Sequence, residues 1–170
     1  MAPRPHDGTR ESQESRALNE DLVSFFDPRL CIFDLKARTK DEALEEIVDL
    51  WASLGRRPSR QYILNMLQHR EALGSTATGK GVALPHGRSL AVTRLVAIFA
   101  RSRQGIDFDS LDGAPTHLFF VLLAPLQEPI GNYLPVLGRM IERAMKDDVL
   151  RNRLLQASTF KEFVGVLRGG

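Results

Sequence analysis

The residues best suited to chemistry lie in Leu73–Arg88, a segment with four glycines, one proline and one histidine. The histidine, His86, stands between Pro85 and Gly87. Pro85 fixes its own backbone angle, and Gly87 is expected to let the chain turn away at once and to leave backbone amides close to the ring. A neutral imidazole presented at a strand end can act as a nucleophile. The pattern therefore indicates covalent group transfer; the alternative is that His86 only fills a turn.

Other kinds of catalytic site have little support in the sequence. It has no His-x-x-x-His or Cys-x-x-Cys spacing and no Gly-x-Ser-x-Gly elbow. Gly74 and Gly79-Lys80 have the spacing of a phosphate loop, but Gly81 replaces the hydroxyl residue that would hold magnesium. A hydrolase, a metal enzyme and a nucleotide site are therefore disfavoured, and we expect no metal and no cofactor.

The remaining histidines and the cysteine are expected to be structural or exposed. His69 falls on a predicted helix, His117 opens a buried strand, and His6 belongs to the amino-terminal tail. Cys31 stands beside Ile32 and Phe33, as a small core residue would. A single cysteine excludes an intramolecular disulfide and fits a reducing compartment.

The overall composition is that of one soluble domain. The chain has 170 residues, 43% of them hydrophobic and 26% charged. Lys and Arg outnumber Asp and Glu by only 23 to 21, so we expect no nucleic-acid partner. No signal peptide and no membrane span is evident, which predicts a cytoplasmic protein. Residues 1–18 are expected to form a flexible tail, and residues 19–170 the domain.

The elements that must position His86 alternate between strands and helices. After a turn at Asp27-Pro28, residues 30–33 are expected to form a first strand. Two helices should follow: one over residues 39–54, with a capping box from Thr39 and Glu42, and one capped by Ser59 that ends near Glu71.

The second half of the chain begins with two continuous apolar runs, residues 95–100 and 118–123, which predict strands covered on both faces. Helical patterns then begin at Leu134, near Leu150, and at Thr159, where a second capping box stands. This order predicts an α/β fold: a three-layer sandwich with a central mixed sheet flanked by helices on both faces.

The sequence around the histidine resembles the fructose/mannitol-type IIA domains of the bacterial phosphotransferase system. The signature is carried by Arg70–Ala77 and by Gly79–Gly87, whose final Pro-His-Gly holds the family's phosphoryl-accepting histidine. The similarity continues at Asp107-Phe108, at Leu111–Gly113 and at Leu122–Pro125, and covers about residues 20 to 168. The family's fold also agrees with the predicted order of elements.

The resemblance implies a role for each matching residue. His86 would accept a phosphoryl group, and the planar guanidinium of Arg70 would bind two of its oxygens. Gly74, Ser75 and Thr76 would supply amides and hydroxyls near the oxygens, or would only turn the helix end. Lys80 and Arg88 add positive charge to the same segment or are plain surface residues.

One position departs from the family pattern. Members commonly carry a second histidine at the start of the long helix after the Leu122–Pro125 strand. Alignment places Tyr133 there, with Asn132 adjacent. A hydroxyl or an amide can donate a hydrogen bond to phosphate but carries no positive charge. The departure predicts slower transfer or a shorter-lived phosphorylated form.

The resemblance implies a phosphohistidine carrier rather than a free-standing turnover enzyme. The donor would be HPr or its nitrogen-branch relative, and the acceptor a IIB domain or regulatory target proteins. Without an attached transporter or IIB domain, the expectation is a nitrogen-type regulatory protein. A sugar-specific IIA subunit and a phosphorylation-silent binding module stay open as alternatives, and Tyr133 supports the second.

Overall fold

The sheet is built from the apolar runs of the sequence together with the glycine-rich segment. The computed structural model describes residues 22–127 and 130–169, and within them the sheet has six strands. The strands are β1 (Phe26–Ile32), β2 (Ala77–Gly79), β3 (Val82–Ala83), β4 (His86–Ser89), β5 (Val96–Ile106) and β6 (Thr116–Pro125).

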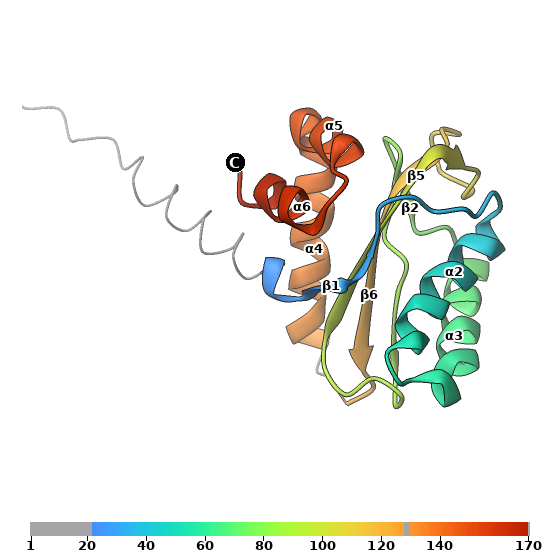
Figure 1. The fold of residues 1–170 in the computed structure, drawn as a ribbon. Helices are drawn as coiled ribbons and strands as arrows, with labels where there is room; N and C mark the ends of the chain where they lie inside the picture. The colour runs from blue at the N-terminus through green and yellow to red at the C-terminus, as the bar shows by residue number, and fades with distance from the viewer. Residues whose placement is uncertain (1–21, 128–129, 170) are drawn as a thin grey trace, which may run out of the picture.

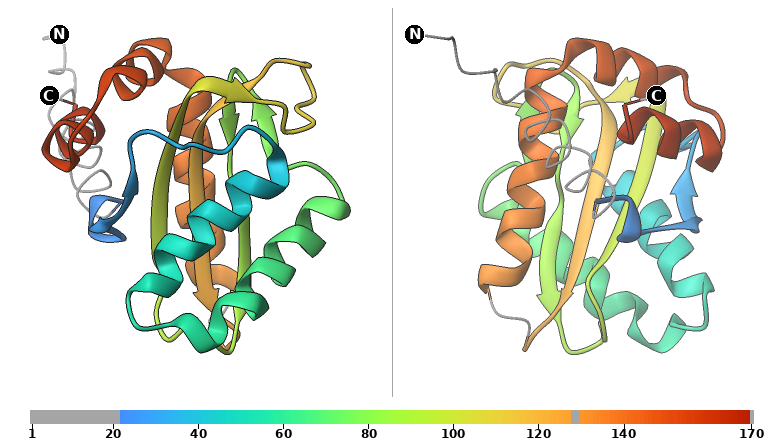
Figure 2. Two further views of the ribbon diagram at one scale, coloured as in Figure 1. Left: turned by 45° about the vertical axis from the view of Figure 1, so that its right-hand side comes forward. Right: turned by 90° about the vertical axis from the view of Figure 1, so that its left-hand side faces the viewer.

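Helices form the two outer layers. Their bounds are α2 (Lys40–Ser53), the 3-10 helix η1 (Arg57–Ser59), α3 (Arg60–Ala72), α4 (Ile130–Lys146), α5 (Asp148–Gln156) and α6 (Phe160–Leu167). Figure 1 shows α2 and α3 on one side of the sheet and α4, α5 and α6 on the other. The two further views in Figure 2 show the same layers from either side. The predicted three-layer sandwich is therefore confirmed.

The strand order β1-β5-β6-β3-β2 makes the sheet mixed. β1 runs parallel to β5, β5 runs antiparallel to β6, and both β3 and β4 run parallel to β6. β3 and β4 pair with successive parts of β6, so they act as one strand that is interrupted at Leu84-Pro85. Among the described strands β4 pairs with β6 alone, and its outer edge is open.

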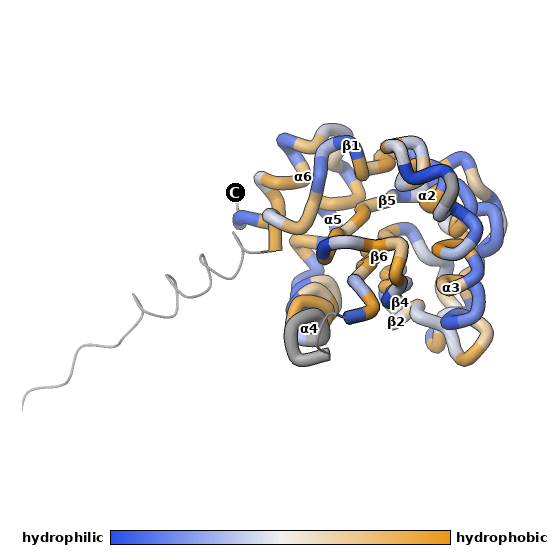
Figure 3. Tube along the Cα trace, turned by 90° about the horizontal axis from the view of Figure 1, so that it is seen from below, coloured by the Kyte–Doolittle hydropathy of each residue, from blue (hydrophilic) through white to orange (hydrophobic). Residues whose placement is uncertain are grey.

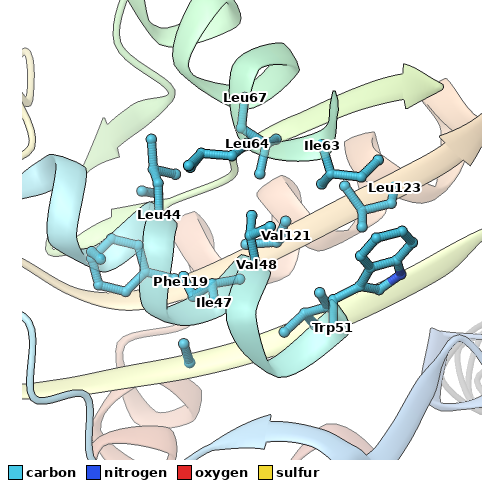
Figure 4. Packing of buried hydrophobic residues seen from close by; sticks show 14 of the residues in the cluster. Leu44, Ile47, Val48, Trp51, Ile63, Leu64, Leu67, Phe119, Val121 and Leu123 are labelled. Atoms are coloured by element: carbon cyan, nitrogen blue, oxygen red, sulfur yellow. The ribbon is translucent and has the colours of Figure 1, made fainter. Parts of the chain in front are cut away.

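Each face of the sheet has its own hydrophobic core. On one face α2 and α3 pack on the strands, with Trp51 and Ile63 buried against the β6 side chains Val121 and Leu123 (Figure 4). On the other face α4, α5 and α6 bury their apolar sides against β5 and β6, centred on Phe163. Figure 3 shows hydrophobic segments on both sides of the sheet. The alternation of side chains along β6 thus supplies both cores.

The predicted helix boundaries are confirmed at α2 and modified at α3. Thr39 and Glu42 form the expected capping box, and Gly55 after the helix has a φ of +85°. Ser59, the predicted cap of α3, has helical backbone angles and makes no side-chain capping bond. The 3-10 turn η1 leads directly into α3, so the backbone is already helical where a cap was expected.

Two predictions about irregular segments are wrong. The Asp27-Pro28 turn lies inside β1, which tolerates it because β1 is an edge strand whose pairing with β5 is irregular between Phe26 and Cys31. The glycine-rich segment contributes β2, β3 and the start of β4. The chain also does not turn away at Gly87, because Gly87 continues β4 and pairs with Leu123.

Gly87 is instead required by the close approach of α3. A Cβ atom at this position would lie 2.7 Å from Sδ and 3.0 Å from Cγ of Met66. We predict that Gly87→Ala lowers the free energy of unfolding by about 1 kcal/mol, because Met66 must shift. Urea denaturation measures the change.

The matched control is Gly138→Ala in α4, where an added Cβ meets nothing within 4 Å. A glycine in a helix interior is unfavourable, so this variant should gain about 0.5 kcal/mol. In a Met66→Ala background Gly87→Ala should lower the free energy of unfolding only slightly, because the side chain that it meets is gone. An unchanged cost in that background would show that Met66 is not the cause.

Candidate functional site

His86 is the first residue of β4, and its ring is half-buried. Nδ1 lies 2.9 Å from the backbone carbonyl oxygen of Leu84. A carbonyl only accepts hydrogen bonds, so Nδ1 carries the proton and donates it. In the neutral ring Nε2 is then unprotonated, and its lone pair is the one available to an electrophile.

The register of the sheet decides which side of β4 each residue faces. His86 pairs with Leu122, which belongs to the core under α4, whereas Gly87 pairs with Leu123, which belongs to the core under α3. Viewed from below in Figure 3, β4 lies between α3 and α4. The open edge of β4 is therefore the place where groups from both helical layers can reach the imidazole.

Arg70 lies in the last turn of α3. It follows Met66, which contacts Gly87, by one helical turn on the same face. Its Nη1 donates a hydrogen bond of 2.7 Å to the carbonyl oxygen of Gly74. No hydrogen bond joins Arg70 to His86, so in this structure the guanidinium is held by the turn after α3.

The turn at residues 74–76 is tied to the histidine segment through the backbone. The carbonyl oxygen of Thr76 accepts from the amide of Leu84 at 3.0 Å, and the carbonyl of Leu84 in turn binds His86. The hydroxyl of Ser75 donates to the carbonyl of Phe108 at 2.6 Å. Thr76 is thus linked through Leu84 to the histidine segment, whereas Arg70 bonds to the carbonyl of Gly74 and the Ser75 hydroxyl already has a structural partner.

A buried carboxylate that sequence reasoning missed holds this turn in place. Glu71 is 7% exposed, and its carboxylate accepts from both the amide and the hydroxyl of Thr76. Lys40 is the charged partner of this carboxylate. Its Nζ lies 2.9 Å from Oε2 of Glu71 and 3.1 Å from Oδ2 of Asp109. Glu71 falls four residues after the buried Leu67 on α3, and this helical spacing was the sequence signal that Glu71 would face the core.

The ammonium of Lys40 lies between the carboxylates of Glu71 and Asp109. Burial lowers the pKa of Lys40, but hydrogen bonds and charge attraction from Glu71 and Asp109 outweigh burial, so the pKa is raised. Its Nζ also lies 4.8 Å from the centre of the Phe108 ring. Lys40 therefore joins the start of α2, the end of α3 and the loop between β5 and β6.

Lys80 lies away from His86, in the turn between β2 and β3. Its backbone has a φ of +55°, its amide donates to Asp112 at 2.8 Å, and Nζ donates to the carbonyl of Met145 at the end of α4. The amide of Lys80 and other donors lower the pKa of Asp112. The contribution of Asp112 to stability is present above the pKa of the unfolded carboxyl and is lost as the pH falls towards the folded value.

The other residues suggested by the family resemblance are placed only in part. Arg88 lies in β4, two residues after His86, and is half-buried. Asn132 and Tyr133 lie in the first turn of α4, but their side chains are outside what the structure describes. α4 follows the carboxyl end of β6, the end with which β4 pairs.

The remaining histidines and the cysteine lie outside this arrangement. His69 is exposed on α3, and His117 donates from Nδ1 to the carbonyl of Ser102 at 2.9 Å. Cys31 is half-buried rather than a full core residue, and burial raises its pKa to about 12. His6 lies outside the described residues.

Residues 22–127 and 130–169 contain neither a cluster of metal ligands nor a helix suited to a membrane. No group of three His, Cys, Asp or Glu side chains could hold a metal ion. No helix in the same ranges has the length and apolar character needed to cross a membrane.

Comparison with known proteins shows the family. Residues 24–169 match the model of the phosphoenolpyruvate-dependent sugar phosphotransferase system, EIIA 2. A nitrogen regulatory protein of Bradyrhizobium diazoefficiens is 36% identical over 86% of this chain and 92% of its own. A fructose-specific EIIA component of Haloferax volcanii is 36% identical over 76% of this chain and 82% of its own. The chain belongs to the EIIA type 2 family of the phosphotransferase system.

Solved structures agree with this assignment. The nitrogen regulatory protein IIA-Ntr of Neisseria meningitidis superposes with a TM-score of 0.77 at 30% identity, covering 86% of this chain and 98% of its own. The mannitol IIA enzyme of Escherichia coli, solved in complex with phosphorylated mannitol IIB, has a TM-score of 0.69 at 21% identity, covering 85% and 99%. The second similarity concerns the fold alone.

The hydrogen bonds and ion pair of Glu71 predict that removing its carboxylate strongly destabilises the fold. Glu71→Ala leaves Lys40 without its buried partner and the amide and hydroxyl of Thr76 without an acceptor. We expect the free energy of unfolding to fall by about 3 kcal/mol. Urea denaturation measures it.

The control is Glu45→Ala, a carboxylate on the exposed side of α2. Its loss should change stability by less than about 0.5 kcal/mol. Equal costs for the two variants would contradict a special role for the buried carboxylate.

Proposed function

We propose that the protein is a phosphocarrier whose acceptor is Nε2 of His86. The observation that carries this proposal is the hydrogen bond from Nδ1 to the carbonyl of Leu84, which leaves the other ring nitrogen with a free lone pair. Family membership supplies the reaction class, and the matching Pro85-His86-Gly87 supplies the residue. The protein is modified and restored in each cycle, so it acts as a carrier and not as a turnover enzyme.

The reaction is a transfer between two imidazoles. The lone pair of Nε2 attacks the phosphorus of a phosphohistidine on the donor, a new P–N bond forms, and the donor's P–N bond breaks. The donor nitrogen keeps the bonding electron pair. Because the two leaving groups are of the same kind, transfer is reversible. The proton stays on Nδ1, which donates it to the carbonyl of Leu84 and so fixes the orientation of the ring.

Arg70 is the proposed partner for the phosphoryl oxygens. The transition state of such a transfer spreads negative charge over three oxygens, so positioning and neutralisation dominate catalysis. Nη1 of Arg70 is bound to Gly74, which leaves the remaining guanidinium donors for oxygens at the edge of β4. The amide of Ser75 and the side chains of Asn132 and Tyr133 are further proposed donors to the same group. The amide of Gly74 already donates to the carbonyl of Glu71 at 3.1 Å.

The surroundings of the site suit a docking partner. Tyr62, one turn before Met66 on α3, is 71% exposed, Leu73 beyond Arg70 is 75% exposed, and Leu90 after β4 is 69% exposed. Exposed apolar groups around a polar centre are typical of protein interfaces. We propose that an HPr-like carrier docks here as donor, in the cytoplasm, and that a IIB domain or a regulatory target follows as acceptor.

A regulatory role is favoured over a sugar-specific one. The nitrogen regulatory protein of Bradyrhizobium diazoefficiens aligns over a larger share of both chains than the fructose-specific relative does, at the same identity. The alternatives are a sugar-specific IIA subunit and a binding module that has lost efficient transfer. Tyr133, in place of the family's second histidine, supports the last of these.

Phosphorylation of His86 can be tested by mass spectrometry. The protein is incubated with phosphoenolpyruvate, enzyme I and HPr, and an acid-labile gain of one phosphoryl group is expected. The gain should vanish in His86→Ala and persist in His69→Ala, which removes an exposed histidine on α3. A gain that survives in His86→Ala would refute the assignment, and no gain with any tested HPr would favour the silent module.

Arg70 can be tested through the transfer rate. Arg70→Gln is expected to slow phosphorylation by about 100-fold, because charge neutralisation in the transition state is lost. Rapid-quench kinetics measure the rate, and thermal unfolding checks that the fold is retained. Lys80→Gln is the control, since it removes one positive charge from the same segment at a point away from His86. Similar rates for the two variants would argue against a specific role for Arg70.

A further inference from the structure

A polar hollow lies between one end of the sheet and the end of α5. It has a volume of about 390 Å³, and it is lined by Arg101 and Arg103 of β5, His117 of β6, and Leu155, Gln156 and Ser158 at the end of α5. Figure 1 shows α5 beside the end of the sheet opposite the arrowhead of β6. Nothing in the proposed phosphocarrier reaction uses these residues.

Arg101 is the unusual member of this group. It is 2% exposed, and its Nε and Nη1 donate to three backbone carbonyls, those of Phe33, Leu155 and Ala157. A guanidinium has five N–H donors, so the two on Nη2 remain. Nη2 is shielded from solvent and has no hydrogen-bond partner. A buried, incompletely bonded cation is costly unless something supplies the missing partner.

The protein does not neutralise Arg101 with a carboxylate of its own. Among the described residues no acidic side chain forms an ion pair with Arg101, and burial together with the charge of Arg103 lowers its pKa. Asp34 and Glu162 are the carboxylates whose charge reaches it. Asp34 is paired with Lys36, and Glu162 accepts from the amide of Ser158.

Two other residues, Arg103 and Gln156, add donors to the same hollow. The Arg103 side chain is 65% exposed, and its Nε lies 4.0 Å from Asp34. It belongs to a stretch where the pairing of β5 with β6 is irregular, between Arg101 and Ile106. Nδ1 of His117 already donates to the carbonyl of Ser102, so Nε2 of the neutral ring is an acceptor, and His117 lines the hollow without adding a donor. Gln156 contributes a side-chain amide.

The hollow is separate from the proposed phosphorylation site. His117 precedes Leu122, the pairing partner of His86, by five residues of β6. At about 3.4 Å per residue this is about 17 Å along the strand. The two sites lie toward opposite ends of the sheet.

We propose that this hollow binds the phosphate group of a small molecule, with Arg101 and Arg103 as its cationic contacts and Gln156 as a further donor. Two guanidinium groups suit a phosphate, which carries up to two negative charges and several acceptor oxygens. The bound anion supplies a negative charge for the buried guanidinium of Arg101, which has no carboxylate paired with it among the described residues. Because Arg101 also binds the last carbonyls of α5, occupancy stabilises the contact between α5 and the sheet.

The test is an NMR titration of the full chain with inorganic phosphate and, separately, with glycerol 2-phosphate. The resonances of the His117 ring and of Arg101 Nε–H should shift and saturate, whereas sodium chloride at equal ionic strength should leave them unchanged. Tighter binding of either probe supports the proposal and identifies the source of the phosphate. Equal shifts with chloride would overturn it.

Variants distinguish a built site from general charge attraction. Arg103→Gln should weaken binding by about ten-fold, the loss of one charge-assisted hydrogen bond. Arg153→Gln is the matched control, because it removes the same charge from the exposed side of α5. Equal weakening by both variants would overturn the proposal.

A further variant separates this site from the proposed phosphocarrier site. In His86→Ala the titration of the hollow should be unchanged. Binding that disappears in His86→Ala but survives in Arg103→Gln would place the anion at β4 and refute the second site. The outcome is independent of whether His86 is phosphorylated, so failure of one proposal leaves the other intact.

Discussion

The buried carboxylate of Glu71 is the interaction on which the position of the histidine depends. It binds the amide and hydroxyl of Thr76 and the ammonium of Lys40, and so joins α3 to α2 and to the loop after β5. The carbonyl of Thr76 then holds Leu84, whose own carbonyl orients His86. Removing a charge from water is costly unless such partners compensate it. The ring is therefore oriented by contacts that begin in the core.

The site is assembled at a sheet edge because its parts come from both outer layers. His86 faces the layer of α4, while Arg70 comes from α3 on the opposite side. Only around the open edge of β4 can groups from the two layers meet. Gly87 leaves room for the Met66 side chain of α3 beside the strand, since an added Cβ would lie within 3.0 Å of it.

The sequence predicted those features that depend on one side chain or on a regular pattern. The capping box at Thr39, the apolar strands β5 and β6, and the special surroundings of His86 all carry such signals. The short strands β2, β3 and β4 do not, because backbone hydrogen bonds such as that from Leu84 to Thr76 leave no pattern of residue types. The place of Glu71 could not be predicted without knowing that Lys40 would be beside it. The roles of Asn132 and Tyr133 stay predictions.

The shortness of β4 affects how long a docking partner can stay bound at its edge. Its outer edge offers the backbone groups of only four residues, His86–Ser89, and no other described strand pairs with it. A polypeptide that approached this edge could form few main-chain bonds, so its departure would be fast, and dissociation rates account for most differences in affinity between related complexes. Brief encounters suit a relay, in which each molecule must leave before the next one can arrive.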